Sequence, residues 1–303
     1  MKAVVIVPLF QGARYIRACL KSLQQQSEQP YIIVVNNGSQ DEGPAIVRQE
    51  FPNIELLDFA QPLGFAGAVN VGIRTVLTSE DRPDIIIALN QDTEVDTDWL
   101  SVIIKTFEKP TVGLVGCLAR FPDGRIQHAG GTLLEPLWYG KNRQSIDESS
   151  PVHYVAGLAL GMRVSLLEQI GLFDEGFHPA YFEDVDLCLR AVTHGWQIEL
   201  AKEATLIHHE GALQQTLPGH AYIIERHRWR LLLKHRSLTD LHEVVFPAER
   251  TLMRERAEAG TSDNLRSAYF QSLLALPQIA RERGWTKAEI DSVREQFIKL
   301  RSE

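Results

Sequence analysis

Short β-rich runs alternate with amphipathic helical stretches over the first 118 of this chain's 303 residues, and this alternation restricts the fold more than any other feature. Five runs rich in apolar and β-branched residues are expected to be strands, at 4–7, 32–35, 54–58, 84–89 and 112–117. Apolar residues at helical spacing follow Gln11, Glu42, Gly64 and Thr97. Strands that alternate with helices form βαβ units, so the pattern predicts an α/β fold with a mostly parallel, buried, Rossmann-like nucleotide-binding sheet.

The rest of the chain changes character twice. Residues 119–151 contain FPDGR, GG and a polar KNRQSIDESSP tract, which predicts a long loop across the face of the sheet. An apolar run over 155–162, a helix to about residue 170 and two short strands near 197–200 and 204–207 are expected next. Everything after residue 215 has a helical pattern. We therefore expect an α/β domain over 1–215 and a helical C-terminal extension over 216–303.

The composition is that of an ordinary soluble globular protein, with 44% hydrophobic and 23% charged residues. A net charge of −8 argues against a nucleic-acid binder, which needs a basic surface. No stretch reaches the roughly 18 apolar residues that a spanning helix needs, and the first residues are typical of a buried strand rather than a signal peptide. Cys19, Cys117 and Cys188 lie far apart in apolar patterns, as core residues do in a reducing compartment. We therefore expect a cytoplasmic protein.

Ligands of open α/β sheets bind at the carboxyl ends of the strands, so the residues just past each strand are the first candidates for a site. The second strand ends in Asn36, Asn37 and a Gly-Ser pair, whose amides either read a nucleobase edge or only form a turn. Gly64 and Asn70 belong to a glycine-rich entry to a helix, which brings backbone amides close to a phosphate. The spaced G-x-G-x-x-G dinucleotide fingerprint is missing from this sequence, and that weighs against a dehydrogenase.

An acidic burst follows the fourth strand. Asn90, Gln91 and Asp92 come first, and a carboxylate there suits a hard divalent cation. Asp96 and Asp98, which come next, are better explained as caps of the following helix. Asp92 is therefore the better ligand candidate.

Two further motifs carry titratable side chains. Asp184 lies in the run FEDVD at the start of a helix, where it either caps the helix or stays ionised and accepts a proton from a bound alcohol. His208 and His209 follow the strand-like run ATLI, and a histidine there is either a packed residue or a metal ligand. If the ligand is a diphosphate, a divalent cation held by carboxylates is the simplest means of neutralising it in a protein of net charge −8.

The motifs taken in order resemble glycosyltransferase family 2, of GT-A fold, and within it the bacterial rhamnosyltransferase-like members. The resemblance covers about residues 3–211 and rests on VVIVPLFQGARYIRACLKSL, IIVVNNGSQD, PLGFAGAVNVGI, ALNQDTEVDTDWL, GLFDEGFHPAYFEDVDLCLRAVTHGW and ATLIHHEG. It implies a GT-A domain over 1–215, with a donor-binding half at about 1–118 and an acceptor and catalytic half at about 119–215. The extension over 216–303 lies outside the resemblance.

The family also implies roles for individual residues. Pro8, Phe10 and Asn37 would line the nucleobase pocket, with Gln91 near the ribose. Asp92, the last residue of the family's D-x-D motif, would bind a divalent metal ion, Mn²⁺ or Mg²⁺, that bridges both phosphates.

The catalytic half carries the remaining roles. Asp184, in the family's E-D motif, would be the general base that deprotonates the acceptor hydroxyl. His208 would complete the metal site, and His209 takes its place if the register slips by one residue.

This sequence departs from the family at two places. Many relatives have Asp where Asn36 or Asn37 stands, and an amide still pairs with a base edge but alters which base it prefers. Asn90 replaces the first Asp of the D-x-D motif, and a neutral carbonyl there implies weaker metal binding or greater reliance on His208.

The resemblance implies an inverting sugar transfer by a single displacement. The expected donor is a nucleotide diphosphate sugar, with rhamnose on thymidine diphosphate (dTDP) as the first expectation and uridine diphosphate (UDP) hexoses as the other. The expected acceptor is a saccharide or lipid-linked hydroxyl in the synthesis of a bacterial surface polysaccharide or glycan. The loop at 119–150 would close over the donor and exclude water.

The helical tail leaves several partners open. HAYIIERHRWRLLLKHRS mixes apolar and basic residues, and such a helix either contacts the inner face of the cell membrane peripherally or packs on its own domain. The last helices, around 265–280 and 288–300, are expected to pack together or to form a homodimer contact.

Two other classes of function compete with a transferase. A sugar nucleotidyltransferase shares the nucleotide-binding half but wants a glycine-rich, basic loop after the first strand, which PLFQGARYI does not supply. A catalytically silent sugar- or nucleotide-binding protein on the same fold is suggested by Asn90, and retention of Asp92, Asp184 and His208 speaks against it.

Overall fold

The chain divides into two compact units in the computed structural model, which describes residues 1–146, 151–209 and 219–302. One unit comprises Met1–Thr132 and Lys141–Thr216, and the other Leu133–Gly140 and Leu217–Glu303. The boundary expected at residues 215 and 216 lies outside the described residues. The segment 133–140 interrupts the first unit in sequence and belongs to the second.

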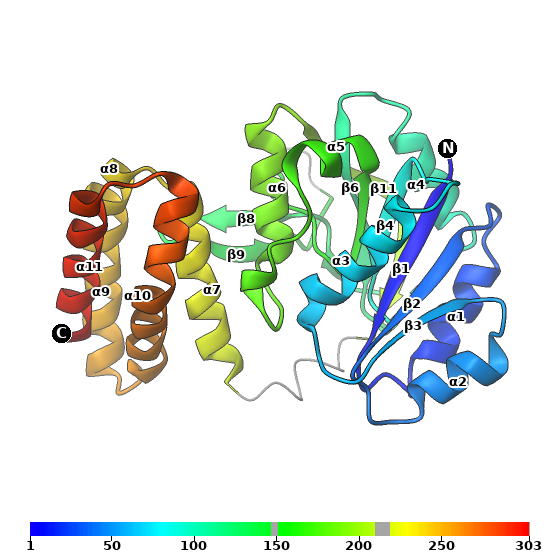
Figure 1. The fold of residues 1–303 in the computed structure, drawn as a ribbon, viewed down its shortest axis with the longest axis horizontal. Coiled ribbons are helices and arrows are strands. Elements are labelled where there is room, and N and C mark those ends of the chain that lie inside the picture. The colour runs from blue at the N-terminus through cyan, green and yellow to red at the C-terminus, as the bar shows by residue number, and fades with distance from the viewer. Residues whose placement is uncertain (147–150, 210–218, 303) are drawn as a thin grey trace. The chain divides into compact units, whose positions relative to one another are not determined.

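A nine-stranded sheet lies at the centre of the first unit, in the order β3-β2-β1-β4-β10-β6-β11-β5, with β7 paired to β6 (Figure 1). The strands are β1 (Ala3–Leu9), β2 (Tyr31–Asn37), β3 (Glu55–Phe59), β4 (Ile85–Leu89), β5 (Thr93–Val95), β6 (Val112–Arg120), β7 (Ile126–His128), β10 (Ala159–Arg163) and β11 (Gln197–His208). The first four pair in parallel, as the βαβ pattern predicts. β10 runs antiparallel to β4 and β6, and β5 antiparallel to β11, so the sheet is mixed.

Helices cover both faces of this sheet, which explains why its central strands are apolar along their whole length. They are α1 (Ile16–Gln24), α2 (Gly43–Glu50), α3 (Gly64–Leu77), α4 (Trp99–Thr106), α5 (Val164–Ile170) and α6 (Glu183–Thr193). Val5 and Val7 of β1 share one core cluster with residues of α1 and α4. Ile6 points the other way, toward Gly72 of α3, where an added Cβ would lie 2.7 Å from Ile6 Cγ2. Gly72 therefore permits the close packing of α3 on β1.

The prediction of a long loop over 119–151 is wrong for most of that range, which contains three strands. Asp123 and Gly124 turn the chain tightly, with Gly124 at a φ of +87°, and β7 returns antiparallel to β6. β8 (Gly131–Leu134) and β9 (Tyr139–Asn142) then form a separate two-stranded sheet. The two short strands expected near 197–207 are one strand, β11, with an irregularity between Ala201 and Thr205.

The second unit is helical, as the sequence predicts. Its helices are α7 (His220–His235), α8 (Leu238–Asp240), a π-helical turn (Leu241–Val245), α9 (Phe246–Glu258), α10 (Asp263–Arg283) and α11 (Lys287–Ser302). Aromatic rings of four helices meet in its core, where Trp229 stacks on Phe246 and meets the edges of Tyr269 and Phe297. Among the described residues, none of the helices combines the length and the apolar character needed to cross a membrane.

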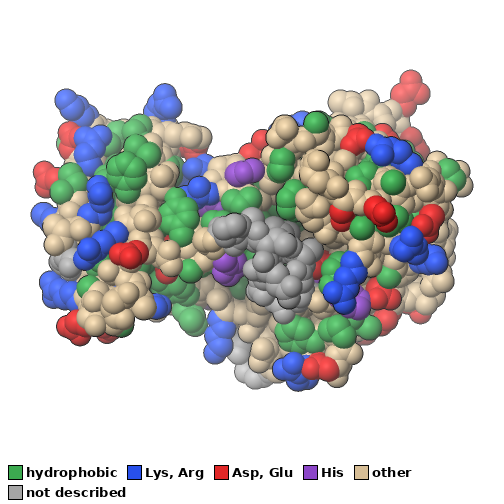
Figure 2. Space-filling model, turned by 90° about the horizontal axis from the view of Figure 1, so that it is seen from below, with side chains coloured by type: hydrophobic (Ala, Val, Ile, Leu, Met, Phe, Trp, Pro, Cys, Tyr) green, Lys and Arg blue, Asp and Glu red, His purple; other side chains and the backbone are tan. Residues whose placement is uncertain are grey.

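The helix α7 packs within its own unit, one of the two alternatives considered from the sequence, and two of its arginines are buried rather than solvated. Arg228 is fully buried and Arg230 is only 8% exposed, while Trp229 and Leu231–Leu233 are buried beside them. On the face that Figure 2 shows, the basic side chains of the helical unit are scattered among acidic and apolar ones. Burial of these side chains therefore favours packing of α7 within its own unit over contact with a membrane surface, which stays a prediction.

Arg228 is the electrostatic centre of the second unit. Its guanidinium donates to Glu249 Oε1 at 2.6 Å and pairs with Glu225 at 2.8 Å. It also lies 4.6 Å from the ring centre of Tyr139, which comes from the 133–140 segment and donates its hydroxyl to Glu225. Tyr269 donates to the same Glu249 oxygen. The buried arginine thus ties α7, α9, α10 and the 133–140 segment together.

Replacing Arg228 by Met is expected to lower the free energy of unfolding of the helical unit by about 3–5 kcal/mol, because two carboxylates lose their buried counter-ion. Urea denaturation followed by tryptophan fluorescence measures this loss. Arg294→Met is the matched control, since Arg294 pairs with Asp291 at the surface and should change stability little. Equal effects of the two substitutions would contradict the importance of the buried pair.

Candidate active site

An acid and an imidazole meet where β4 and β11 end. β5 pairs antiparallel with β11, and the register sets His208 opposite Thr93, the residue after Asp92. His208 Nε2 consequently lies 3.2 Å from Asp92 Oδ1, and both residues are buried. The neighbouring His209 instead pairs with Glu94 at 2.6 Å. Of the two histidines considered from the sequence, His208 is therefore the one beside Asp92.

The pair Asp92 and His208 offers one carboxylate oxygen and one imidazole nitrogen. Among the described residues, no group of three or more His, Cys, Asp or Glu side chains could hold a metal ion. A divalent cation commonly takes one or two protein ligands and fills its remaining positions with phosphate oxygens and water. With bonds of about 2.1 Å, two ligands at right angles lie about 3 Å apart, which suits the observed separation. This donor pair fits a cation shared with a diphosphate.

Two residues of β7, Gln127 and His128, lie near His208, and neither was predicted from the sequence. Gln127 Oε1 lies 2.8 Å from His208 Nδ1. His128 accepts the backbone N–H of Ala156 at its Nε2, so its Nδ1–H is left to donate to Asn142 Oδ1. The only sequence signal was the Asp-Gly dipeptide, which is typical of a tight hairpin and would have placed a strand here.

Asp184 lies at the second position of the first turn of α6. Its carboxylate accepts the N–H groups of Gly157 and Val185, each at 2.8 Å. Burial raises the pKa of Asp184 above its ordinary value, and these hydrogen bonds oppose the shift. The helix N-terminus also favours the ionised form. A carboxylate with a raised pKa is a better proton acceptor than an ordinary aspartate.

The residues just before Asp184 are conformationally strained. Tyr181 and Phe182 both have positive φ angles, +80° and +72°, which cost non-glycine residues of order 1–3 kcal/mol each. Glu183 is buried beside them, and burial, followed by the charge of Asp184, raises its pKa well above the ordinary value. Burial therefore favours the neutral form of Glu183. Such strain is concentrated at functional sites, where the surrounding structure holds it in place.

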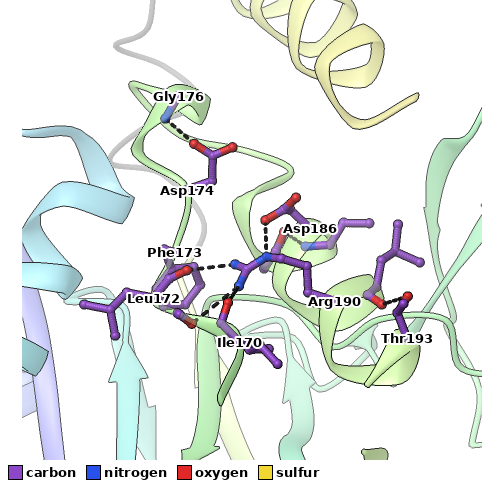
Figure 3. Close-up of polar contacts among 12 residues, drawn as sticks. Ile170, Leu172, Phe173, Asp174, Gly176, Asp186, Arg190 and Thr193 are labelled. Carbon is purple, nitrogen blue, oxygen red and sulfur yellow. Dashed lines mark hydrogen bonds and ion pairs between the residues drawn. The ribbon is translucent and has the colours of Figure 1, made fainter. Parts of the chain in front are cut away.

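Arg190, in the last turn of the same helix, bonds to the chain segment that precedes the helix, as Figure 3 shows. Its guanidinium donates to the backbone carbonyls of Ile170 and Leu172 at 2.8 Å and to Asp186 Oδ2 at 2.8 Å. Asp186 is fully buried, so this is a buried pair that also satisfies the end of α5. The position of α6, and with it Asp184, is thereby fixed against the α5–α6 connection.

Three consecutive residues before β10 connect the parts of the site. Ala156 donates its N–H to His128, Gly157 donates to Asp184, and the carbonyl of Leu158 accepts the N–H of Asn90. β7, α6 and the end of β4 are thus held by a single short backbone segment. The segment thus bonds directly to Asp184 and to Asn90, which lies two residues before Asp92 and 94 positions before Asp184 in sequence.

The expected nucleobase end of the site is a set of interlocked loops. Gln91 donates to the carbonyl of Phe10 at 2.7 Å and accepts its N–H at 2.8 Å. Ser39 accepts the N–H of Gln11, and Asp41 accepts that of Ala13. Pro8 and Phe10 are half-buried at this edge. Gln91 therefore fixes the loop after β1, and its predicted proximity to the ribose stays a prediction.

The two asparagines at the end of β2 are already hydrogen-bonded within the protein. Asn36 donates to Asp58 Oδ1 at 2.5 Å and accepts the N–H of Ser39. Asn37 accepts the N–H of Leu63 at 2.6 Å and donates to the carbonyl of Gly64. Each amide thus uses both of its ends to hold neighbouring loops. Reading of a base edge by Asn36 or Asn37 stays a prediction.

The glycine-rich entry to α3 has a packing role. Gly64 has a φ of +74°, and a Cβ there would lie 2.6 Å from His178 Nδ1. The N–H of the next residue, Phe65, donates to the carbonyl of Pro179. Asn70 is buried and bonds both backbone groups of Phe173, so it too faces the catalytic half. Phosphate contact by Gly64 or Asn70 stays a prediction.

The capping role expected for Asp96 and Asp98 is not what the structure shows. Asp98 is the N-cap of α4 but makes no side-chain capping bond, and Asp96 instead accepts the hydroxyl of Thr205 on β11. Asn90 lies half-buried at the end of β4, with its backbone bonded to Leu158.

The candidate site thus combines the loops at the ends of β1 and β2, the Asp92–His208 pair and the helix-borne Asp184. The sequence profile of glycosyl transferase family 2 matches residues 4–171, more than half of the chain. The chain belongs to this family. The solved mannosyltransferase PcManGT from Pyrobaculum calidifontis superposes with a TM-score of 0.57 at 17% identity, covering 99% of this chain and 85% of that one. The fold is therefore GT-A with a C-terminal helical extension, as the sequence predicts.

Curated relatives match the same part of the chain. The O-antigen biosynthesis protein RfbC of Myxococcus xanthus is 28% identical over 232 residues, 70% of this chain and 17% of that protein. The N-acetylglucosaminyl-diphospho-decaprenol L-rhamnosyltransferase of Mycobacterium tuberculosis is 28% identical over 236 residues, 68% of this chain and 75% of that protein. The chain thus spans about a sixth of the length of the first relative and three quarters of the second.

Acid is expected to destabilise the first unit through His128. Burial lowers the pKa of His128 to about 4, from 6.5. Between these two pH values the unfolded chain binds a proton that the folded protein does not bind. The free energy of unfolding should therefore fall by about 3 kcal/mol between pH 6.5 and pH 4. Urea denaturation across this range measures the slope. It should flatten in His128→Gln but persist in His194→Gln, which replaces an exposed histidine.

Proposed function

We propose that this protein is an inverting, metal-dependent glycosyltransferase that moves a sugar from a nucleotide diphosphate to a hydroxyl acceptor. The observation that carries the proposal is the joining of Asp92 and His208 to Asp184 through the 156–158 segment. One part of this arrangement suits a cation and a leaving diphosphate, and the other suits removal of a proton from an alcohol.

The proposed reaction is a single displacement. Asp184 accepts the proton of the acceptor hydroxyl as its oxygen attacks the anomeric carbon, from the face opposite the nucleotide. The bond between that carbon and the diphosphate oxygen breaks, so the configuration inverts. Asp92 and His208 would hold the divalent cation, Mn²⁺ or Mg²⁺, which neutralises charge on the leaving diphosphate. Gln91, Phe10 and Pro8 would support the nucleoside, together with Asn36, Asn37, Gly64 and Asn70.

The relatives support a choice of substrates. One is named for O-antigen biosynthesis and the other for transfer of L-rhamnose to a lipid-linked diphosphate sugar. The PcManGT structure holds GDP-mannose and Mn²⁺. We therefore propose dTDP-rhamnose as the donor, with UDP-hexoses as the second candidate, and a saccharide or lipid-linked acceptor in surface polysaccharide synthesis. Peripheral membrane contact and a homodimer stay proposals, and they do not rest on the surface of α7.

Calorimetric titration with dTDP, UDP and GDP, each with Mn²⁺ and then with a chelator, tests the metal and nucleotide assignment. We expect one nucleotide to bind only with the cation, and binding to be lost in Asp92→Ala. Asp98→Ala is the control, because Asp98 is exposed and six residues away. Failure of every diphosphate to bind under both conditions would favour a silent protein of the same fold instead.

Asp184→Asn tests the proposed base. Its kcat should fall by about 10²–10⁴-fold while donor binding stays unchanged, because only proton transfer is removed. Since burial raises the pKa of Asp184, the acidic limb of the wild-type kcat/KM profile should lie above the ordinary carboxyl range. Sugar transfer from the donor, followed across pH by chromatography, measures both effects. A variant with near-normal kcat would exclude Asp184 as the base.

A further inference from the structure

Gln127 has no role in the reaction proposed above, yet it is buried against His208, which does. Its side chain is 6% exposed, and Oε1 lies 2.8 Å from His208 Nδ1. The opposite nitrogen of the same ring, Nε2, faces Asp92 Oδ1 at 3.2 Å. The imidazole is therefore held between an amide oxygen on one side and a carboxylate on the other.

The chemistry of imidazole gives this arrangement a meaning. A neutral ring carries its proton on one nitrogen only, and a ring can bind a cation only through the nitrogen that lacks the proton. An amide oxygen accepts hydrogen bonds and cannot donate them, so the contact with Gln127 favours the proton on Nδ1. Nε2 then presents its lone pair toward the Asp92 carboxylate at 3.2 Å, and two acceptors this close are stable with a cation between them.

We propose that Gln127 is a positioning residue for the cation site, which sets the proton of His208 on Nδ1 and turns Nε2 toward the cation that Asp92 also binds. This inference rests on the proposed function, because it needs Asp92 and His208 to be the ligands. Partners of this kind orient metal-bound histidines and raise the basicity of the ligating nitrogen. The ligand class is a divalent first-row cation that accepts both oxygen and nitrogen.

The strand that carries Gln127 is fixed on its other side as well. β7 pairs with β6 through Ala119 and His128, and the same Ala119 pairs with Leu206 of β11, two residues before His208. His128 is itself held by Ala156 and Asn142. The backbone around Gln127 therefore has little freedom to shift, and its side chain can hold the ring in one orientation.

Three variants separate this role from simple packing. Gln127→Met keeps the length of the side chain and removes the acceptor, whereas Gln127→Glu keeps an acceptor and adds charge. Gln26→Met is the matched control, because Gln26 is equally buried and hydrogen-bonded, but to Asp96 and Leu100 at the α1–α4 junction.

The first measurement is Mn²⁺ affinity, obtained by electron paramagnetic resonance of the free ion, with Mn²⁺ alone and with dTDP or UDP present. We expect Gln127→Met to weaken Mn²⁺ binding by about 10–100-fold, as loss of such partners does elsewhere. Gln127→Glu should bind at least as tightly as wild type, and Gln26→Met should match wild type.

The second measurement is ¹⁵N NMR of the neutral His208 ring in the metal-free Asp92→Ala protein, which shows which nitrogen carries the proton once the competing carboxylate is gone. With Gln127 present the proton should lie on Nδ1, and adding Gln127→Met should give a mixture. Any one of three results would overturn the role of Gln127 and leave the proposed function standing. They are unchanged Mn²⁺ affinity in Gln127→Met, weaker Mn²⁺ binding in Gln127→Glu, and an equal loss of Mn²⁺ affinity in Gln26→Met. Absence of Mn²⁺ binding by wild type, with or without nucleotide, would instead overturn the proposed function and this inference with it.

Discussion

Three hydrogen bonds made by backbone groups of residues 156–158 are the constraint on which the rest of the site depends. Through them a single stretch of chain touches the strand that carries Gln127, the helix that carries Asp184 and the end of β4 next to Asp92. Buried backbone groups must find partners, so these contacts are determined as firmly as a strand pairing. The position of Asp184 relative to the Asp92–His208 pair therefore depends on this one segment, which bonds to the His128 ring, the Asp184 carboxylate and the backbone of Asn90.

The part of the fold that sequence predicts best is the part stabilised by local pattern. β1 to β4 and their helices follow from alternating apolar runs, because a strand buried on both faces must be apolar throughout. Asp92, Asp184 and His208 were singled out because each stands near a strand end or at a helix start, and the structure sets His208 beside Asp92, while their roles stay predictions. The pairing of β11 with β5, which selects His208 over His209, is a long-range contact that no local pattern contains.

The failures have equally particular causes. Gln127 and His128 were not predicted as site residues because their strand, β7, is short and polar. The Asp123–Gly124 turn, which is typical of a hairpin, was assigned to a loop. The sequence also did not show that Asn36, Asn37 and Asn70 each hold a neighbouring segment by a hydrogen bond, and their predicted ligand contacts stay predictions. The arginines of α7 look solvated because sequence does not show that Glu249, 21 residues from Arg228, is buried beside them.

The exchange of residues 133–140 into the helical unit has a consequence for the evolution of this chain. Tyr139 completes the charge network around Arg228 from a point in the sequence that precedes the helices by about 80 residues. A gene fusion that cut at the start of the helices would therefore separate the arginine from one of its partners. A helical tail moved to another protein would keep its buried carboxylates but would lack the ring and hydroxyl of Tyr139.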